Sequence, residues 1–284
     1  MNKILEGFKK EVQFMENWTK ELFLTLGKLP YEENDVRKDY FKVSYSNTYH
    51  YYISYLNILQ SHLLNTKYFL LNKDIFKNFE VQVARLQNIT NHPRHLEAHH
   101  NTLNQRVFVM AWSLFELCIS TFYENVVTQE ELEKQFNSEY LDVLKTVEVK
   151  EGKEEKFKKL LIKDSLHSIP IPKKYNYLLK IANGYGRDIG EDRAFLDFFG
   201  RFRNTVHSNF IFYGKDFTYR FGDAEFVFKN KKLVKWFDPF DEGNFAPPVK
   251  LYFYLIGNLN NIVMEIFRSV PKEGFIGYPD LDSY

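Results

Sequence analysis

The chain is poor in the two residues that interrupt regular backbone structure. Its 284 residues include 13 Gly and 9 Pro, which together make about 8% of the chain. Average proteins use these two residue types at about 12% together. Apolar residues recur every three or four positions over long stretches, which is the spacing that places them on one side of an α-helix. The scarcity of helix breakers therefore predicts a mainly helical protein built from long helices.

The helical spacing predicts several long segments, some with recognisable end signals. The first is followed by Gly27 and Pro30, the order in which helices commonly end. Pro247 and Pro248 precede the last, where proline suits a first helical turn. The predicted helices are Met1–Leu26, Ser44–Leu71, Asp74–Val83, Arg94–Val127, Gln129–Thr146, Glu154–His167, Glu191–Ser208 and Val249–Ser269. The prolines of Ser168–Lys174 are expected to interrupt the helical pattern.

The periodicity changes to alternation near residues 216–237. The segment FTYRFGDAEFVFKNKKLVKWF alternates, with turn residues at Gly222-Asp223 and Asn230-Lys231. The predicted fold class is thus mainly α, a multi-helix bundle with a small antiparallel β-hairpin or meander inserted at 216–237. We expect an N-terminal helical region over residues 1–91, packed on a bundle over residues 92–270, and an irregular tail over residues 271–284.

Charge and cysteine content exclude several classes of protein. Lys and Arg total 38 and Asp and Glu total 37, too even a balance for a protein that coats nucleic acid, although it allows a local basic site. Cys118 is the one cysteine, so an internal disulfide is impossible and a reducing compartment fits best. The N-terminus lacks the uninterrupted apolar run of a signal peptide. Val107–Tyr123 is apolar but carries Glu116 at its middle, which predicts a buried helix. We expect a cytoplasmic protein without membrane contact.

One polar group carries the functional hypothesis. Within Phe198–Asn209, Arg203 and His207 are four residues apart and project from the same face of a predicted helix, beside a stripe of phenylalanines. A histidine can act as general acid or base near neutral pH. An arginine can hold a phosphate and stabilise the charge that develops on it. Asn204 adds neutral hydrogen bonds. If the 2′-hydroxyl of RNA is the nucleophile, no metal ion is required.

The run Arg203-Asn204-Thr205-Val206-His207 resembles the RN…H motif of the HEPN domain family, small helical bundles found in prokaryotic defence and toxin–antitoxin systems. In outline the resemblance extends over roughly Arg94–Ser269. It implies metal-independent RNA cleavage or nucleotide binding, with no cofactor. Arg203 and His207 would be the catalytic residues, supported by Asn204, Glu116 and Arg201. The resemblance also implies a homodimer, because such sites are often composed across two copies, and an antitoxin or other protein partner.

Two arginines are candidates for the arginine of the motif. Three residues separate Arg203 from His207, fewer than is usual in catalytic members of the family. Five residues separate Arg201 from His207, but Phe202 then stands where the family has a polar residue. Gly200, on the inner side of the helix, would allow another helix to approach closely.

Two further functions remain open. A non-catalytic interaction or dimerisation module would use Arg203 and His207 to hold a partner. A metal-dependent hydrolase would use His95 and His99, which are four residues apart and could share a metal ion on one helix face, with His92 nearby. This histidine cluster contains neither an HExxH motif nor a cysteine.

Overall fold

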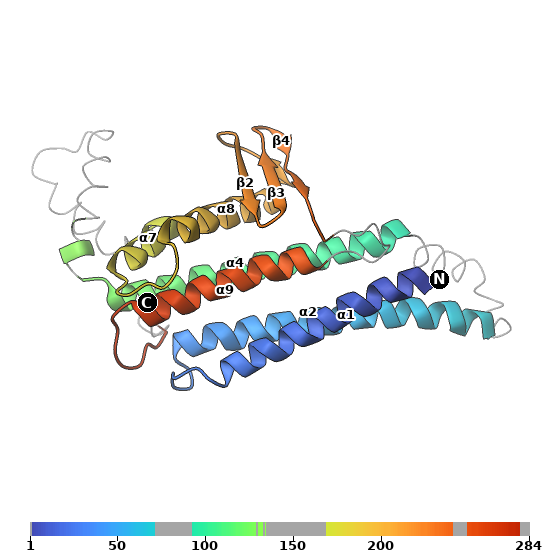
Figure 1. The fold of residues 1–284 in the computed structure, drawn as a ribbon, viewed down its shortest axis with the longest axis horizontal. Helices are drawn as coiled ribbons and strands as arrows, with labels where there is room; N and C mark the ends of the chain where they lie inside the picture. The colour runs from blue at the N-terminus through green and yellow to red at the C-terminus, as the bar shows by residue number, and fades with distance from the viewer. Residues whose placement is uncertain are drawn as a thin grey trace, which may run out of the picture. The chain divides into compact units, whose positions relative to one another are not determined.

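The computed structural model describes residues 2–71, 93–128, 130–132, 134, 169–240 and 249–278. Over these residues the protein is mainly helical with a small antiparallel β-region, as the sequence predicts (Figure 1). The helices are α1 (Asn2–Leu26), α2 (Val36–Leu71), α4 (Pro93–Val126), α7 (Ile171–Ile181), α8 (Ile189–His207) and α9 (Lys250–Ser269). The helices predicted at Asp74–Val83, Gln129–Thr146 and Glu154–His167 lie wholly or largely outside the described residues.

Two helices differ from the prediction. Helix α2 begins at Val36 rather than near Ser44, because the carboxylate of Asp35 accepts the Arg37 N–H (2.8 Å) and caps the first turn. Helix α7 was not predicted, since its first turn lies in the proline-containing segment. Pro170 is its N-cap and a second proline follows within the first turn. The first-turn N–H groups have no intrahelical acceptor, so proline costs nothing there.

The chain divides into two compact units. Unit 1 contains Met1–Pro30, Tyr40–Leu114 and Ala194–Ile262, and unit 2 contains Tyr31–Asp39, Phe115–Arg193 and Val263–Tyr284. Helices α2, α4, α8 and α9 contribute residues to both units. Each unit is thus built from segments that lie far apart in the sequence. The predicted division into residues 1–91, 92–270 and 271–284 stays a prediction.

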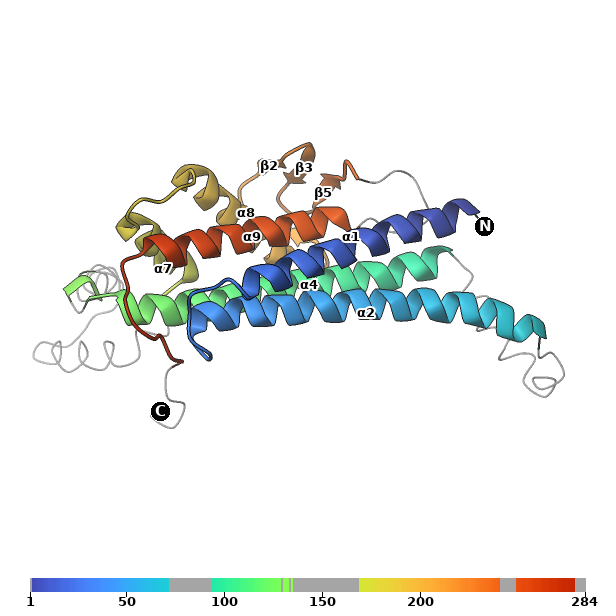
Figure 2. The same cartoon turned by 60° about the horizontal axis from the view of Figure 1, so that its bottom comes forward.

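The interior of unit 1 is aromatic. Helices α1, α2, α4 and α9 lie alongside one another there (Figure 2). The ring of Phe253 on α9 contacts the rings of Phe14 and Trp18 on α1 at centroid distances of 5.9 and 5.8 Å. It also contacts Tyr51 on α2 at 5.4 Å. The predicted apolar faces of the N-terminal and C-terminal helices thus form one core, in which edge-to-face ring contacts predominate.

The predicted β insertion is confirmed. Strands β2 (Phe217–Phe221), β3 (Ala224–Phe228) and β5 (Lys235–Phe237) form an antiparallel sheet in the order β2-β3-β5. Strands β1 (Ile211–Phe212) and β4 (Lys232–Leu233) form a second antiparallel pair. Gly222 (φ 54°) and Lys231 (φ 57°) occupy left-handed conformations at the two predicted turns. Phe226 and Phe228 of β3 are buried.

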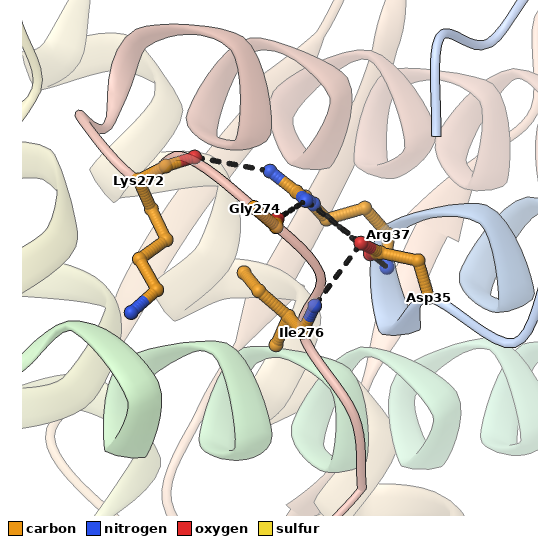
Figure 3. Close-up of polar contacts among 5 residues, drawn as sticks. All are labelled: Asp35, Arg37, Lys272, Gly274 and Ile276. Carbon is orange, nitrogen blue, oxygen red and sulfur yellow. Dashed lines mark hydrogen bonds and ion pairs between the residues drawn. The ribbon is translucent and has the colours of Figure 1, made fainter. Parts of the chain in front are cut away.

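Unit 2 contains a buried ion pair that holds the segment after α9. The guanidinium of Arg37 binds both carboxylate oxygens of Asp35, and it donates to the carbonyl oxygens of Lys272 (3.2 Å) and Gly274 (2.5 Å). The N–H of Ile276 donates to Asp35 (3.2 Å). Figure 3 shows Arg37 between the Asp35 carboxylate and the two carbonyl groups. We call these five residues the Arg37 clasp.

Among the described residues, one helical segment is long and apolar enough to cross a membrane. It is Thr102–Val126 of α4. The core helices of many proteins have the same length and composition. Most apolar side chains of the predicted buried stretch are indeed buried, including Phe108, Phe115 and Cys118, whereas Met110 and Leu117 are exposed.

Candidate functional site

Helix α8 carries the predicted motif, and its own sequence accounts for its two ends. Asp188 precedes the helix and accepts the Glu191 N–H (2.8 Å), and Glu191 and Asp192 place negative charge in the first turn. His207 is the last helical residue. Asn209 (φ 51°) and Phe210 (φ 61°) are left-handed, and the Phe210 N–H returns to the Thr205 carbonyl (2.6 Å). The chain therefore reverses sharply directly after His207.

The phenylalanines of α8 hold the helix between α4 and the three-stranded sheet. On one side Phe199 stacks on Phe108 of α4 at 4.0 Å, and Trp112 stacks on Phe199 at 5.6 Å. On the other side Phe198 stacks on Tyr219 of β2 at 4.2 Å. Because α8 is packed on two sides, only its remaining face is open to solvent.

That remaining face displays the predicted residues. Asn204 and His207 are exposed, and Arg203 is half-buried. The Arg203 Nη1 donates to the Asn204 Oδ1 (3.1 Å), so the amide orients the guanidinium. Arg203 and His207 project from the same side of the helix one turn apart. This places a permanent cation, an amide and an imidazole within one local surface, a combination suited to a phosphodiester.

Arg201 is used differently. Its side chain is exposed, and its guanidinium carbon lies 5.0 Å from the centre of the Phe217 ring in β2. This cation–π contact ties Arg201 to the sheet. Of the two candidate arginines, Arg203 is the one that is hydrogen-bonded to the neighbouring Asn204.

Gly200 performs the packing role expected for it. A Cβ at this position would lie 2.8 Å from Cζ2 of Trp112 on α4. The absence of a side chain therefore lets α8 approach α4 closely. The contact fixes the helix two turns before His207.

The remaining predicted residues are less completely placed. Glu116 lies on α4, is half-buried and belongs to unit 2, so its support of Arg203 stays a prediction. His95 and His99 lie in the first turns of α4, but their side chains and all of His92 are outside the described part of the chain. Within the described residues, no three His, Cys, Asp or Glu side chains come together as metal ligands.

A cavity between α2 and α4 was not predicted from the sequence. It has a volume of about 400 Å³, which is within the range of small-ligand sites. Its lining consists of Asn47, His50, Tyr51, Ser54, Leu103, Arg106, Val107 and Met110. The signal was available, because the polar residues of α2 recur every three or four positions.

The cavity combines one charged side chain with an apolar wall. Arg106 is exposed, and the described residues provide no ion-pair partner for it. His50 lies beside Ser46, with 3.2 Å between Nδ1 and Oγ. Tyr51, which lines the cavity from α2, donates to Asn104 of α4. Such a site suits a small anion with an apolar part.

Comparison of the whole chain with protein-family models, with curated proteins and with solved structures finds no match.

Proposed function

We propose that the protein is a HEPN-like helical bundle that cleaves RNA without a metal ion. The observation that supports this most directly is the grouping of half-buried Arg203 with exposed Asn204 and His207 on the open face of α8. The packing of α8 between α4 and the sheet supports it further, because a fixed helix holds the three side chains in a constant arrangement.

In the proposed reaction His207 removes the proton from an RNA 2′-hydroxyl. The freed oxygen attacks the adjacent phosphorus, the bond from phosphorus to the 5′-oxygen breaks, and that oxygen leaves with a proton from solvent. The products are a 2′,3′-cyclic phosphate and a 5′-hydroxyl. Arg203 stabilises the negative charge that develops on the phosphoryl oxygens, and Asn204 keeps its guanidinium oriented. A homodimer would complete the site with residues of the second copy.

The test is cleavage of single-stranded RNA in EDTA. Wild-type protein should produce 2′,3′-cyclic phosphate ends, and His207→Ala should lower the rate by about 100-fold or more. Arg203→Ala should have a comparable effect. The matched control is Arg193→Ala, which removes an exposed arginine near the start of the same helix and should leave cleavage normal.

Two results would contradict the catalytic assignment. One is cleavage that persists in His207→Ala, and the other is cleavage that is lost in Arg193→Ala as well. Partial recovery of His207→Ala by added imidazole would separate a catalytic role from a folding role. Sedimentation of wild type and Arg203→Ala would test the dimer and the alternative of a non-catalytic dimerisation module.

A second candidate, nucleotide binding, is favoured by the cavity between α2 and α4. Arg106 would hold the phosphate and the wall formed by Leu103, Val107 and Met110 would contact the base or sugar. Titration calorimetry with AMP and GMP tests this. Binding should disappear in Arg106→Ala and persist in Arg193→Ala. Binding that is equal in wild type and Arg106→Ala would remove the cavity from consideration.

A further inference from the structure

The turn between β3 and β5 carries a local excess of positive charge. Residues 229–237 contain Lys229, Lys231, Lys232 and Lys235 and no acidic residue, although the whole chain has a net charge of +1. All four lysines are exposed. Across the sheet Arg220 is paired with Glu225, but within the described residues none of these four lysines has an ion-pair partner.

Large apolar side chains are exposed among the lysines. Leu233 is 61%, Phe237 62% and Tyr213 65% exposed. Phe237 is the register partner of Glu225, whereas its neighbour Trp236 is the partner of buried Phe226, so Phe237 projects from the face of the sheet opposite α8. Tyr213 lies beside the turn, because the Lys231 N–H donates to the Phe212 carbonyl (2.7 Å).

We call Tyr213, Leu233, Phe237 and the four lysines the basic-aromatic surface. Two residues next to its members, Val234 and Trp236, contact the end of α8 and the residues that follow it. The Val234 N–H donates to the Phe210 carbonyl (2.8 Å), and the ring of Trp236 contacts Phe202 (5.8 Å) and Phe210 (5.6 Å). Figure 1 shows the strands beside the end of α8. The surface therefore adjoins the helix end that carries Arg203 and His207.

Protection of a sheet edge explains only part of this arrangement. Lysines on an edge strand commonly prevent other chains from pairing with it. Leu233 and Phe237 work against that purpose, because exposed apolar groups on an edge promote association. Proteins that bind single-stranded nucleic acid commonly combine two features. They have basic side chains that contact phosphates, and next to them exposed rings on which bases stack.

We propose that the basic-aromatic surface binds single-stranded RNA and delivers it to the end of α8. Lysines 229, 231, 232 and 235 would contact backbone phosphates, and Tyr213 and Phe237 would stack on unpaired bases. A base within a duplex is not available for such stacking. The substrate class is thus single-stranded rather than duplex RNA. The inference rests on the proposed function for cleavage, but the binding can be measured separately.

The experiment uses a fluorescein-labelled 2′-O-methyl oligouridine, which binds but cannot be cleaved. Fluorescence anisotropy gives its affinity for the full-length protein over a range of salt concentrations. In Lys231→Gln/Lys232→Gln/Lys235→Gln the slope of log affinity against log salt should fall by about two units. Phe237→Ala should weaken binding by about five- to hundredfold.

The chain offers a matched control for each variant. Lys9→Gln/Lys20→Gln/Lys28→Gln removes three exposed lysines of the α1 region and the same charge. Phe23→Ala removes a phenylalanine of α1 that is 56% exposed. Both controls should bind the oligonucleotide as wild type does. Circular dichroism of all variants confirms that they fold.

Three results would overturn the inference. The first is an equal loss of affinity in the lysine variants of the sheet and of α1. The second is a duplex that binds as tightly as the single strand. The third is a lysine variant of the sheet that loses binding to phosphatidylserine vesicles but still binds the oligonucleotide as wild type does.

If the sheet variants lose binding to the oligonucleotide but wild-type protein cleaves no RNA, the binding surface stands and the ribonuclease proposal fails. If cleavage depends on His207 but the sheet variants bind the oligonucleotide normally, the ribonuclease proposal stands and the proposed binding surface fails.

Discussion

The Arg37 clasp and the basic-aromatic surface use positive charge in opposite ways. In the clasp, the guanidinium of Arg37 reaches one carboxylate and two carbonyl groups, and its side chain is only 8% exposed. On the surface, four lysines lie in solvent, and no ion pair occupies them among the described residues. A charge whose partners all come from its own chain serves to hold the fold. A charge that no internal partner neutralises remains available for a ligand.

The largest effect is expected from breaking the clasp. Arg37→Met leaves the Asp35 carboxylate buried without its cation and should lower the free energy of unfolding by about 3–5 kcal/mol. Urea denaturation measures the loss. The control is Arg220→Met, which breaks an ion pair whose arginine is 77% exposed and should cost at most about 1 kcal/mol. Equal losses in the two variants would contradict the distinction between the two regions.

The next largest effect tests the packing beneath the candidate site. Gly200→Ala places a Cβ about 2.8 Å from Trp112 and should destabilise the protein by about 1–3 kcal/mol, even though alanine favours a helix. The proposed RNA cleavage should fall with it, because α8 must move. Gly190→Ala in the first turn of α8 meets only the Asp188 carboxylate, at 3.1 Å, and should change stability by less than about 1 kcal/mol. A neutral Gly200→Ala would mean that α8 is not fixed by α4.

The Arg37 clasp should also make the free energy of unfolding depend on pH in the acid range. Burial alone would raise the pKa of Asp35, but the hydrogen bonds from Arg37 and from the Ile276 N–H outweigh burial and lower the pKa below its ordinary value of 3.8. The unfolded chain therefore binds a proton at higher pH than the folded one. The stabilisation is complete only well above the unfolded pKa of 3.8, and it is lost as pH falls through the folded pKa.

Chemical denaturation of wild type and Asp35→Asn at a series of pH values isolates this contribution. Glu265 also has a lowered pKa, since hydrogen bonds from Arg268 and the Gly186 N–H outweigh its burial. Because Glu265 is present in both proteins, its effect cancels in the difference. The stability difference should shrink between pH 5 and pH 2. A constant difference would show that Asp35 does not titrate with folding.

The smallest effect on stability is expected from the lysines of the basic-aromatic surface. Lys231→Gln, Lys232→Gln and Lys235→Gln should each change the free energy of unfolding by no more than about 0.5 kcal/mol, because the side chains are exposed and unpaired within the described structure. Thermal unfolding monitored by circular dichroism measures it. A loss comparable to that of Arg37→Met would show that the lysines hold the fold.

The helices were largely predictable because their signal is local. The predicted ends of α1, α4, α8 and α9 agree with the structure to within a residue or two. The β insertion and its two turns were equally predictable, since alternation and turn residues are signals that extend over only a few positions. Helix α7 was not predictable in the same way, because prolines are found both where helices are interrupted and in their first turns.

The candidate site was predictable only in part. The helical spacing of Arg203 and His207 and the close approach at Gly200 follow from the sequence of α8 alone. The hydrogen bond that joins Arg203 to Asn204, and the cation–π contact of Arg201 with Phe217, depend on side-chain conformation and on a strand ten or more residues away. The cavity next to Arg106 requires two helices to meet in one register.

By itself the sequence determined the long helices, the β insertion and the residues that α8 displays beside its phenylalanines. Only the tertiary structure decided which polar groups are satisfied internally and which remain open. Alternation in the insertion places apolar side chains on both faces of the sheet, so the pattern alone does not say that Phe226 is buried and Phe237 exposed. That choice is made when one face packs against α8, because apolar burial depends on which surfaces meet.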